Sequence, residues 1–373
     1  MKIAIISHTE HYKKNDGTIV GWGPTIKEIN NLLKIADSIV HIAPLHKESA
    51  PDSALSYTSD RIKFVSLKKS GGKGIEKLSI LTRAPYNLVK IAKAIRDVDF
   101  VQFRAPTGMG IYVLPFLKLF TNKKYWVKYA GNWKDSQMPL GNKLQKLWLK
   151  TCVSLQTNIT VNGQWKNERK NVIPFENPCL SQADRNLGKE LVEKKTQGDK
   201  VIFCFVGALN SHKGVDQILE SFSRLNEDRI GEIHFVGDGK EKERYLELSK
   251  KIKNKTIFHG FLPKKEINRI YSKSHFIVLP SKSEGFPKVI AEAMNFGCLP
   301  IVSDVSCIGQ YIKNDVNGFL LSSPTSVILQ KNILKSLNLS PVKYNKWICS
   351  NYNLAEKFTY EYYNERLITE IFK

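Results

Sequence analysis

The chain has 373 residues, 42% of them hydrophobic and 25% charged, and its formal net charge is +22. This length and apolar fraction predict two folded domains of ordinary size and exclude a largely disordered polypeptide. No apolar run is long enough to cross a bilayer and the opening segment is too short for a signal peptide, so we expect a cytoplasmic protein. The six cysteines form no Cys-x-x-Cys pair, which predicts reduced thiols rather than disulfides or a zinc site.

The positive charge is concentrated in the N-terminal half. Residues 1–175 carry 28 Lys and Arg against 12 Asp and Glu, whereas residues 176–373 carry 29 against 23. Such a one-sided field favours a polyanionic partner, which could be an anionic membrane surface, a lipid diphosphate or nucleic acid. The alternative is a basic chain whose charge only keeps it soluble.

The N-terminal half alternates short apolar segments with amphipathic ones. This rhythm predicts a doubly wound, mostly parallel α/β sheet, and we assign residues 1–178 to a first domain. The expected strands are 2–7, 38–44, 61–67, 100–104, 125–129 and 157–161.

A long polar loop is expected after the first strand. It covers residues 8–20 and ends in Gly21, Gly23 and Pro24 before a helix over 25–35. Glycine lets a backbone approach a ligand closely, and proline is tolerated where a helix begins. A plain turn explains the same residues equally well.

A basic amphipathic helix is expected over residues 141–151, where three large apolar side chains alternate with three lysines. A helix of this kind can lie on a membrane surface. Its apolar stripe can equally pack into the core of the domain, and the sequence leaves both possibilities open.

A second domain is expected over residues 201–344. The preceding segment, 179–200, is polar and charged, which predicts an interdomain linker. The first strand of the second domain is expected at 201–206, and a buried parallel strand at 275–279.

The stretch after this buried strand carries the chemistry. Its polar loop contains Glu284, Gly285 and Pro287, and Glu292 lies eight residues after Glu284 in an apolar helical segment. Ligands bind at the carboxyl edge of a parallel sheet, and a helix N-terminus offers free N–H groups to an anion. A buried, unpaired carboxylate costs roughly several kcal/mol, and sugar hydroxyls would be suitable partners. The alternative is a solvated loop acid followed by an exposed helix position.

This stretch resembles the Glu-x7-Glu signature of the retaining GT-B nucleotide-sugar glycosyltransferases of the glycogen-synthase-like type (group 1, family 4). The resemblance is strongest over residues 201–320. It implies an α/β protein with the GT-B fold, in which two Rossmann-like doubly wound domains face an interdomain cleft. It also implies that the C-terminal tail, residues 345–373, crosses back onto the first domain. The matching residues are Ser281, Glu284, Gly285, Phe286, Pro287 and Glu292.

The resemblance assigns donor-binding roles in the second domain. Glu284 is expected to orient the donor sugar as the catalytic residue, and Glu292 to accept hydrogen bonds from the ribose hydroxyls. The backbone around Gly260 is expected to read the nucleobase. The helix start at Gly285, Phe286 and Pro287 is expected to stabilise the leaving diphosphate.

A further donor segment begins at Gly207 and resembles the family pattern Val-Gly-Arg-Leu…Lys-Gly. Lys213 matches the lysine that holds the donor diphosphate, whereas Ala208 replaces the arginine. A lysine point charge still suits two phosphates. The missing arginine weakens this grip unless another cation substitutes for it.

In the first domain the resemblance is only general. Gly21 and Gly23 take the position of the glycine-rich loop that faces the donor diphosphate. Relatives often carry a histidine after the fifth strand, and this chain has none there. We expect Asn132 or Asp135 to contact the sugar or acceptor instead.

These observations predict a glycosyltransferase of the hexosyltransferase type. It would move a sugar from a nucleotide-diphosphate sugar to a saccharide or lipid-linked saccharide in surface polysaccharide biosynthesis. The resemblance implies that the transfer retains the anomeric configuration and needs no metal or other cofactor. The basic first domain leads us to expect a peripheral position at the inner face of the membrane. One alternative is a basic nucleic-acid-binding protein, although no helix-turn-helix, zinc or RNP-like motif is present. Another is a GT-B sugar-nucleotide epimerase.

Overall fold

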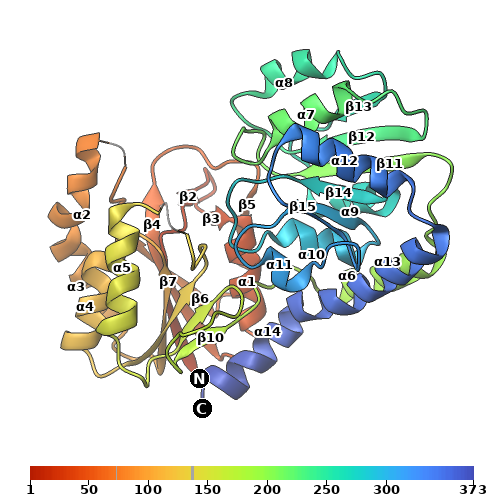
Figure 1. Cartoon of the computed structure of the whole chain (residues 1–373). Coiled ribbons are helices and arrows are strands. Elements are labelled where there is room, and N and C mark those ends of the chain that lie inside the picture. The colour runs from red at the N-terminus through yellow and green to blue at the C-terminus, as the bar shows by residue number, and fades with distance from the viewer. Residues whose placement is uncertain (73, 136–137) are drawn as a thin grey trace. The chain divides into compact units, whose positions relative to one another are not determined.

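The computed structural model describes residues 1–72, 74–135 and 138–373. The chain divides into two compact units, of which the first comprises Met1–Glu176 with Tyr363–Lys373 and the second Asn177–Tyr362. Each unit is a sheet with helices packed against it (Figure 1). The division after Glu176 lies two residues before the end that we expected for the first domain, and within the tail only residues from Tyr363 onward belong to the first unit.

The core sheet of the first unit consists of parallel strands. Along the sheet they follow the order β6–β4–β1–β7–β8–β9–β10, so the chain order reverses between β1 and β7. This is the doubly wound arrangement that the alternating pattern predicted. The bounds are β1 Lys2–Ile6, β4 Ser38–His46, β6 Ile62–Leu67, β7 Phe100–Ala105, β8 Lys124–Tyr129, β9 Ile159–Val161 and β10 Val172–Pro174.

The predicted loop over residues 8–20 is wrong, because this segment contains strands. β2 (His11–Lys13) and β3 (Ile19–Trp22) pair antiparallel, and β5 (Ala54–Ser56) extends the ribbon. These strands have three or four residues each, too few for a period-two pattern to show in the sequence. The helix that follows, α1, spans Gly23–Leu32 instead of 25–35.

Two apolar clusters lie on opposite faces of the first sheet. Ala4 and Ile6 of β1 belong to the cluster that also contains residues of α3, α4 and α5, whereas Ile3 and Ile5 pack with α1 and the end of the chain. Successive residues of a strand point to opposite faces, so one short apolar segment supplies both cores. The other helices are η1 Gly74–Leu78, α2 Ser79–Thr82, α3 Ala84–Ala94, α4 Gly110–Phe120, α5 Leu140–Thr151 and η3 Leu367–Ile371. Helix α14, Tyr360–Arg366, begins in the second unit and enters the first at Tyr363.

The second unit repeats the same winding. Its sheet has the order β13–β12–β11–β14–β15–β16, and the chain order reverses between β11 and β14. All its neighbouring strands are parallel. The bounds are β11 Val201–Val206, β12 Ile230–Val236, β13 Lys255–Phe258, β14 Phe276–Leu279, β15 Leu299–Ser303 and β16 Phe319–Leu321.

The segment predicted as a linker, 179–200, contains helix α6 (Gln182–Lys194) of the second unit. Ser181 and Asp184 form a capping box at its start. The guanidinium of Arg185 is buried and donates to Asn295 Oδ1 at 2.7 Å and to Glu356 Oε2 at 2.9 Å. The sequence looked like a linker because α6 is polar on its exposed side and uses an arginine on its buried side.

The remaining helices of the second unit connect or flank these strands. None of the helices in the described ranges combines the length and the apolar character needed to cross a bilayer. The bounds are α7 Val215–Ser223, α8 Lys242–Ser249, α9 Lys264–Lys273, α10 Lys288–Asn295, α11 Ile308–Tyr311, α12 Ser326–Leu337 and α13 Pro341–Ala355.

Candidate active site

Two predicted segments meet at the switch point of the second sheet. One follows β11 and the other follows β14, and these strands are neighbours. The backbone N–H of Lys282 donates to the carbonyl of His212 at 3.0 Å. Gly214 has a φ of +80°, and a Cβ on it would lie 2.4 Å from the carbonyl oxygen of Pro280. The two loops therefore touch at a place where only glycine fits, and ligands of open α/β sheets bind at such reversals of strand order.

The predicted diphosphate lysine and the predicted catalytic carboxylate form an ion pair there. The Nζ of Lys213 contacts Oε1 of Glu284, and their side chains are 27% and 10% exposed. The backbone N–H of Lys213 donates to Asn210 Oδ1 at 2.9 Å, which fixes the loop from its other side. The arrangement places one cation and one carboxylate together at the sheet edge, both within reach of solvent.

Glu292 has protein partners that the sequence did not indicate. Its Oε1 accepts from Lys264 Nζ at 2.7 Å and its Oε2 from the hydroxyl of Tyr271 at 3.4 Å. Burial opposes the charge of Lys264, but the acidic groups around it, of which Glu292 contributes most, together outweigh burial, and the pKa of Lys264 is raised. Because Lys264 begins α9 and Glu292 lies on α10, only the fold brings them together. Each carboxylate oxygen keeps a lone pair that a ligand hydroxyl can use.

The start of α10 is anchored by an aromatic cluster. Pro287 immediately precedes the helix, which begins at Lys288, so it is one residue earlier than the first-turn position that we expected. Phe286 is 6% exposed, stacks on Phe358 with ring centroids 4.6 Å apart and contacts Tyr311 at 4.9 Å. Its side chain therefore holds the loop in place, and only its backbone remains for the donor role predicted from the sequence.

The glycines near the ends of β11, β12 and β13 lie in loops that pack on one another. The N–H of Gly237 donates to the carbonyl of Gly260 at 2.8 Å, and a Cβ on Gly237 would lie 1.9 Å from the carbonyl oxygen of Gly207. Gly260 has a φ of +67°. The next residue, Phe261, exposes half of its side chain. Glycine is thus needed where these backbones approach closely. The exposed ring of Phe261 lies next to the segment that we expect to read the nucleobase.

A loop that sequence reasoning missed also borders this site. It follows β15, the strand next to β14, and the Sγ of Cys307 donates to the carbonyl of Gly285 at 3.4 Å. Ser306 has a φ of +54°, which is unfavourable for a residue with a side chain, and its buried hydroxyl has no partner in the described ranges. The neighbouring position of two strands in one sheet was the signal that could have found it.

The candidates of the first unit lie in different elements: Gly21 is in β3, Gly23 begins α1, and Asn132 and Asp135 are in the loop after β8. A Cβ on Gly21 would lie 2.6 Å from Nε2 of His11, and one on Gly23 would lie 2.7 Å from the carbonyl oxygen of Ser53. The missing side chains therefore make room for the unit's own atoms, and a role toward the donor stays a prediction. Asn132 follows β8 and accepts from the N–H of Lys134 at 3.0 Å, and Asp135 lies in the same loop.

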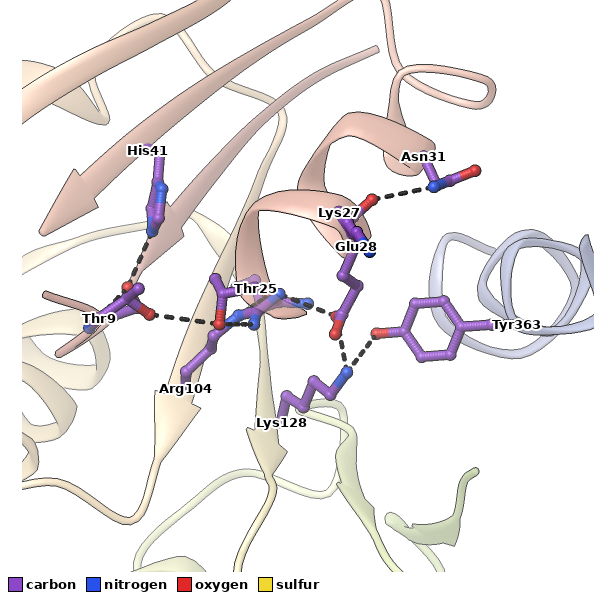
Figure 2. A network of polar contacts seen from close by, with 11 residues as sticks. Thr9, Thr25, Lys27, Glu28, Asn31, His41, Arg104, Lys128 and Tyr363 are labelled. Atoms are coloured by element: carbon purple, nitrogen blue, oxygen red, sulfur yellow. Dashed lines mark hydrogen bonds and ion pairs between the residues drawn. The ribbon is translucent and has the colours of Figure 1, made fainter. Parts of the chain in front are cut away.

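A buried charge network stabilises the first unit near these loops. Arg104 on β7 and Lys128 on β8 are register partners, and Glu28 of α1 accepts from both, at 2.8 and 2.6 Å (Figure 2). Lys128 also donates to the hydroxyl of Tyr363 at 3.3 Å, which ties the end of the chain to this sheet. Arg104 and Lys128 would repel each other if they were buried side by side alone. The carboxylate of Glu28 compensates both charges, so this sheet needs it to fold stably.

Comparison with known proteins finds a family match within the second unit. Residues 189–353 match the family described as Glycosyl transferases group 1. A Haemophilus influenzae protein named uncharacterized glycosyltransferase is 28% identical over 264 residues, which cover 66% of this chain and 72% of that protein. The glycogen synthase of Aquifex aeolicus is 30% identical over 127 residues, covering 33% of this chain and 26% of the synthase.

A solved structure matches the whole chain. The Anabaena protein Alr3699/HepE in complex with UDP-glucose is similar with a TM-score of 0.68 at 14% identity, over 99% of this chain and 98% of that protein. At this identity the similarity concerns the fold. Together with the two doubly wound sheets, it confirms the predicted GT-B fold class.

Proposed function

We propose that the protein moves a sugar from a nucleotide-diphosphate sugar to a saccharide or lipid-linked saccharide acceptor, because residues 189–353 match the group 1 glycosyltransferases. The observation that carries the proposal is the contact between Lys213 and Glu284 at the switch point of the second sheet. The similar protein Alr3699/HepE is in complex with UDP-glucose, so UDP-hexoses are the first donors to test.

Lys213 supplies the positive charge that the leaving group requires. As the nucleoside diphosphate departs, negative charge builds on its phosphates, and a preorganised cation stabilises that charge more strongly than it stabilises the bound donor. Free backbone N–H groups at the start of α10 act in the same direction. In this proposal the lysine and the helix start do the work of a divalent cation, and the transfer needs no metal.

Glu284 positions the donor sugar. Its carboxylate is held by Lys213 without the donor, and it gains a sugar hydroxyl as a further hydrogen-bond partner when the donor binds. The lysine then contacts both the carboxylate and a phosphate oxygen, so sugar and diphosphate are fixed by one pair of side chains. We propose that this placement serves a transfer with retained anomeric configuration.

The nucleoside is held between the segment that follows β13 and the side of α10. The carboxylate of Glu292 accepts hydrogen bonds from the ribose hydroxyls while Lys264 and Tyr271 keep it in position. The exposed ring of Phe261 offers a surface on which a nucleobase can stack. The backbone around Gly260 reads the edge of the base.

The first unit binds the acceptor through the loop that contains Asn132 and Asp135. Its positive charge suits a diphosphate-linked lipid saccharide at the inner face of a membrane, as surface polysaccharide biosynthesis would require. Nucleic acid, the alternative polyanionic partner, would not explain why the second unit has a donor site.

A donor and acceptor screen tests this function. Each nucleotide-diphosphate sugar is first tested for thermal stabilisation of the protein, because a ligand that binds only the folded state raises its stability. We expect one donor class to stabilise the protein, and the release of free nucleoside diphosphate to depend on added acceptor. If no nucleotide sugar stabilises the protein, or if the diphosphate is released equally without acceptor, the proposal is wrong.

A further inference from the structure

Large apolar side chains are exposed at one end of the helical layer of the first unit. Ile75 and Leu140 are 85% and 78% exposed. We call the whole set the apolar rim. It consists of Ile75, Leu78 and Leu81 in η1 and α2, Ile111 in α4, and Leu140, Leu144 and Leu147 in α5.

The helices that carry the rim pack on one another. A Cβ on Gly108, just before α4, would lie 2.8 Å from Cδ1 of Ile80, which places α2 against the start of α4. An apolar groove of about 310 Å³ runs between α4 and α5 and is lined by Ile111, Leu144 and Leu147 among others. Helices α2, α3, α4 and α5 lie together on one side of the unit (Figure 1).

The fold divides the large apolar side chains of residues 141–151 between the core and the surface. Gln145 and Leu149 are the buried residues of α5, whereas Leu140, Leu144 and Leu147 follow the helical period along its exposed side. These three leucines do not pack into the core of the unit, whereas Trp148, on the same helix, is partly buried against it. Helix α5 therefore exposes a row of leucine side chains to solvent, and such an exposed apolar surface is typical of a binding surface.

The charge around the rim is positive. In the segments η1 to α3, α4 and α5 there is one acidic residue, Glu76. Lys143 and Lys77 are exposed close to rim leucines, whereas Lys150 is paired with Glu168 at 2.9 Å. Exposed leucines among lysines are the composition of a helix that lies in the headgroup region of an anionic bilayer. The basic residues of these segments are Lys77, Arg83, Lys90, Lys93, Lys118, Lys143, Lys146 and Lys150.

The rim also lies at the end of the unit where the acceptor loop lies. Helices α4 and α5 each follow a parallel strand, so their first turns are at the carboxyl edge of the sheet. Ile111 is in the first turn of α4 and Leu140 is the first residue of α5. The loop with Asn132 and Asp135 immediately precedes α5, at this same edge.

We propose that the apolar rim docks the first unit on an anionic phospholipid bilayer, with its leucine and isoleucine side chains in the headgroup boundary and its lysines on lipid phosphates. The inference rests on the proposed function for its purpose, which is to bring the acceptor loop to a lipid-linked saccharide. The docking itself requires no turnover and can be measured without a sugar donor.

Vesicle sedimentation tests the docking. The full chain is mixed with phosphatidylcholine vesicles with or without phosphatidylglycerol, and we expect binding only with the anionic lipid and weakening as salt is added. The double variant Leu140→Ser with Leu144→Ser should bind at least about tenfold more weakly, since two inserted leucines are lost. Lys143→Glu should weaken binding to anionic vesicles in the same direction.

Matched controls separate docking from folding and from donor binding. Val342 in α13 is 81% exposed and lies in the second unit, so Val342→Ser should bind vesicles like the unchanged protein. Thermal stabilisation by the donor should be the same in all variants. The proposal would be overturned if the wild-type protein did not bind anionic vesicles, or if the double variant bound them as tightly as the wild type. A concentration-dependent dimer that the double variant abolishes would also overturn it, because the rim would then bind a second copy of the chain.

Discussion

Lys213 and Glu284 form an ion pair although 71 residues separate them along the chain. Each residue stands in the loop after one of two neighbouring strands, and these strands flank the point at which the order of the second sheet reverses. A charged pair at this point can hold a ligand that carries both anionic and hydroxyl groups. A nucleotide-diphosphate sugar is such a ligand.

Position 208 offers a gain-of-function test of the donor site. Ala208 is exposed in the loop that also carries Lys213, where the family pattern has an arginine. Ala208→Arg should lower KM for the donor by about tenfold, because a charge-assisted hydrogen bond to a phosphate contributes roughly 1.5–3 kcal/mol. Steady-state kinetics measures this, and Ala208→Leu is the control for size without charge. An unchanged KM in the arginine variant would show that the loop does not face the phosphates.

The buried network around Glu28 predicts a large effect on stability. Glu28→Gln leaves Arg104 and Lys128 without their shared carboxylate, so the free energy of unfolding should fall by roughly 3–5 kcal/mol. Five of the six tryptophans lie in the first unit, so tryptophan fluorescence in urea reports mainly on it. Glu76→Gln, at an exposed position, is the matched control and should change stability little. Equal unfolding midpoints for both variants would contradict the role of Glu28.

Buried histidines predict a loss of stability on mild acidification. Burial lowers the pKa of His11 and His275 to about 4 and that of His41 well below its usual 6.5. The unfolded chain therefore binds more protons than the folded chain below pH 6.5, so stability falls as the pH decreases from 6.5. The slope is at most about 1.4 kcal/mol per pH unit for each group.

Urea midpoints measured between pH 7 and 5 check this slope, since most carboxylates stay ionised there. In the fold, His275 Nδ1 accepts from the N–H of Ile202 at 3.0 Å, and an asparagine can retain an acceptor near that donor. His275→Asn should therefore reduce the slope, whereas His212→Gln, at an exposed position, should leave it unchanged. A stability independent of pH over this range would show that the pKa values of these histidines are not lowered in the folded chain.

The sequence predicts those parts of the molecule that depend on neighbours along the chain. The strands follow from short apolar segments, and the loop with Glu284 follows from a compact motif. Partners that only the fold brings together could not be predicted in this way. Lys264 and Glu292 lie 28 residues apart, and Lys128 and Tyr363 lie 235 apart. No periodicity in the sequence connects such residues.

Helix α6 and the hairpin of β2 and β3 were missed for other reasons. The buried face of α6 contains Arg185 and Gly188 beside Val192, so the helix shows no apolar stripe. The hairpin strands are too short for an alternating pattern to stand out. In both places the structure depends on tertiary contacts that outweigh local patterning.

Turnover of the Lys213 and Glu284 variants tests the central claim most directly. Lys213→Ala, Glu284→Gln and the double variant are compared with wild type using the donor that stabilises the protein, and Lys282→Ala serves as control for an exposed lysine in the same loops. Each single variant should lower kcat by about 10²–10³, and the double variant should be little worse than the poorer single one, because the two side chains act as a unit. Wild-type kcat in a folded Lys213→Ala or Glu284→Gln protein would contradict the account.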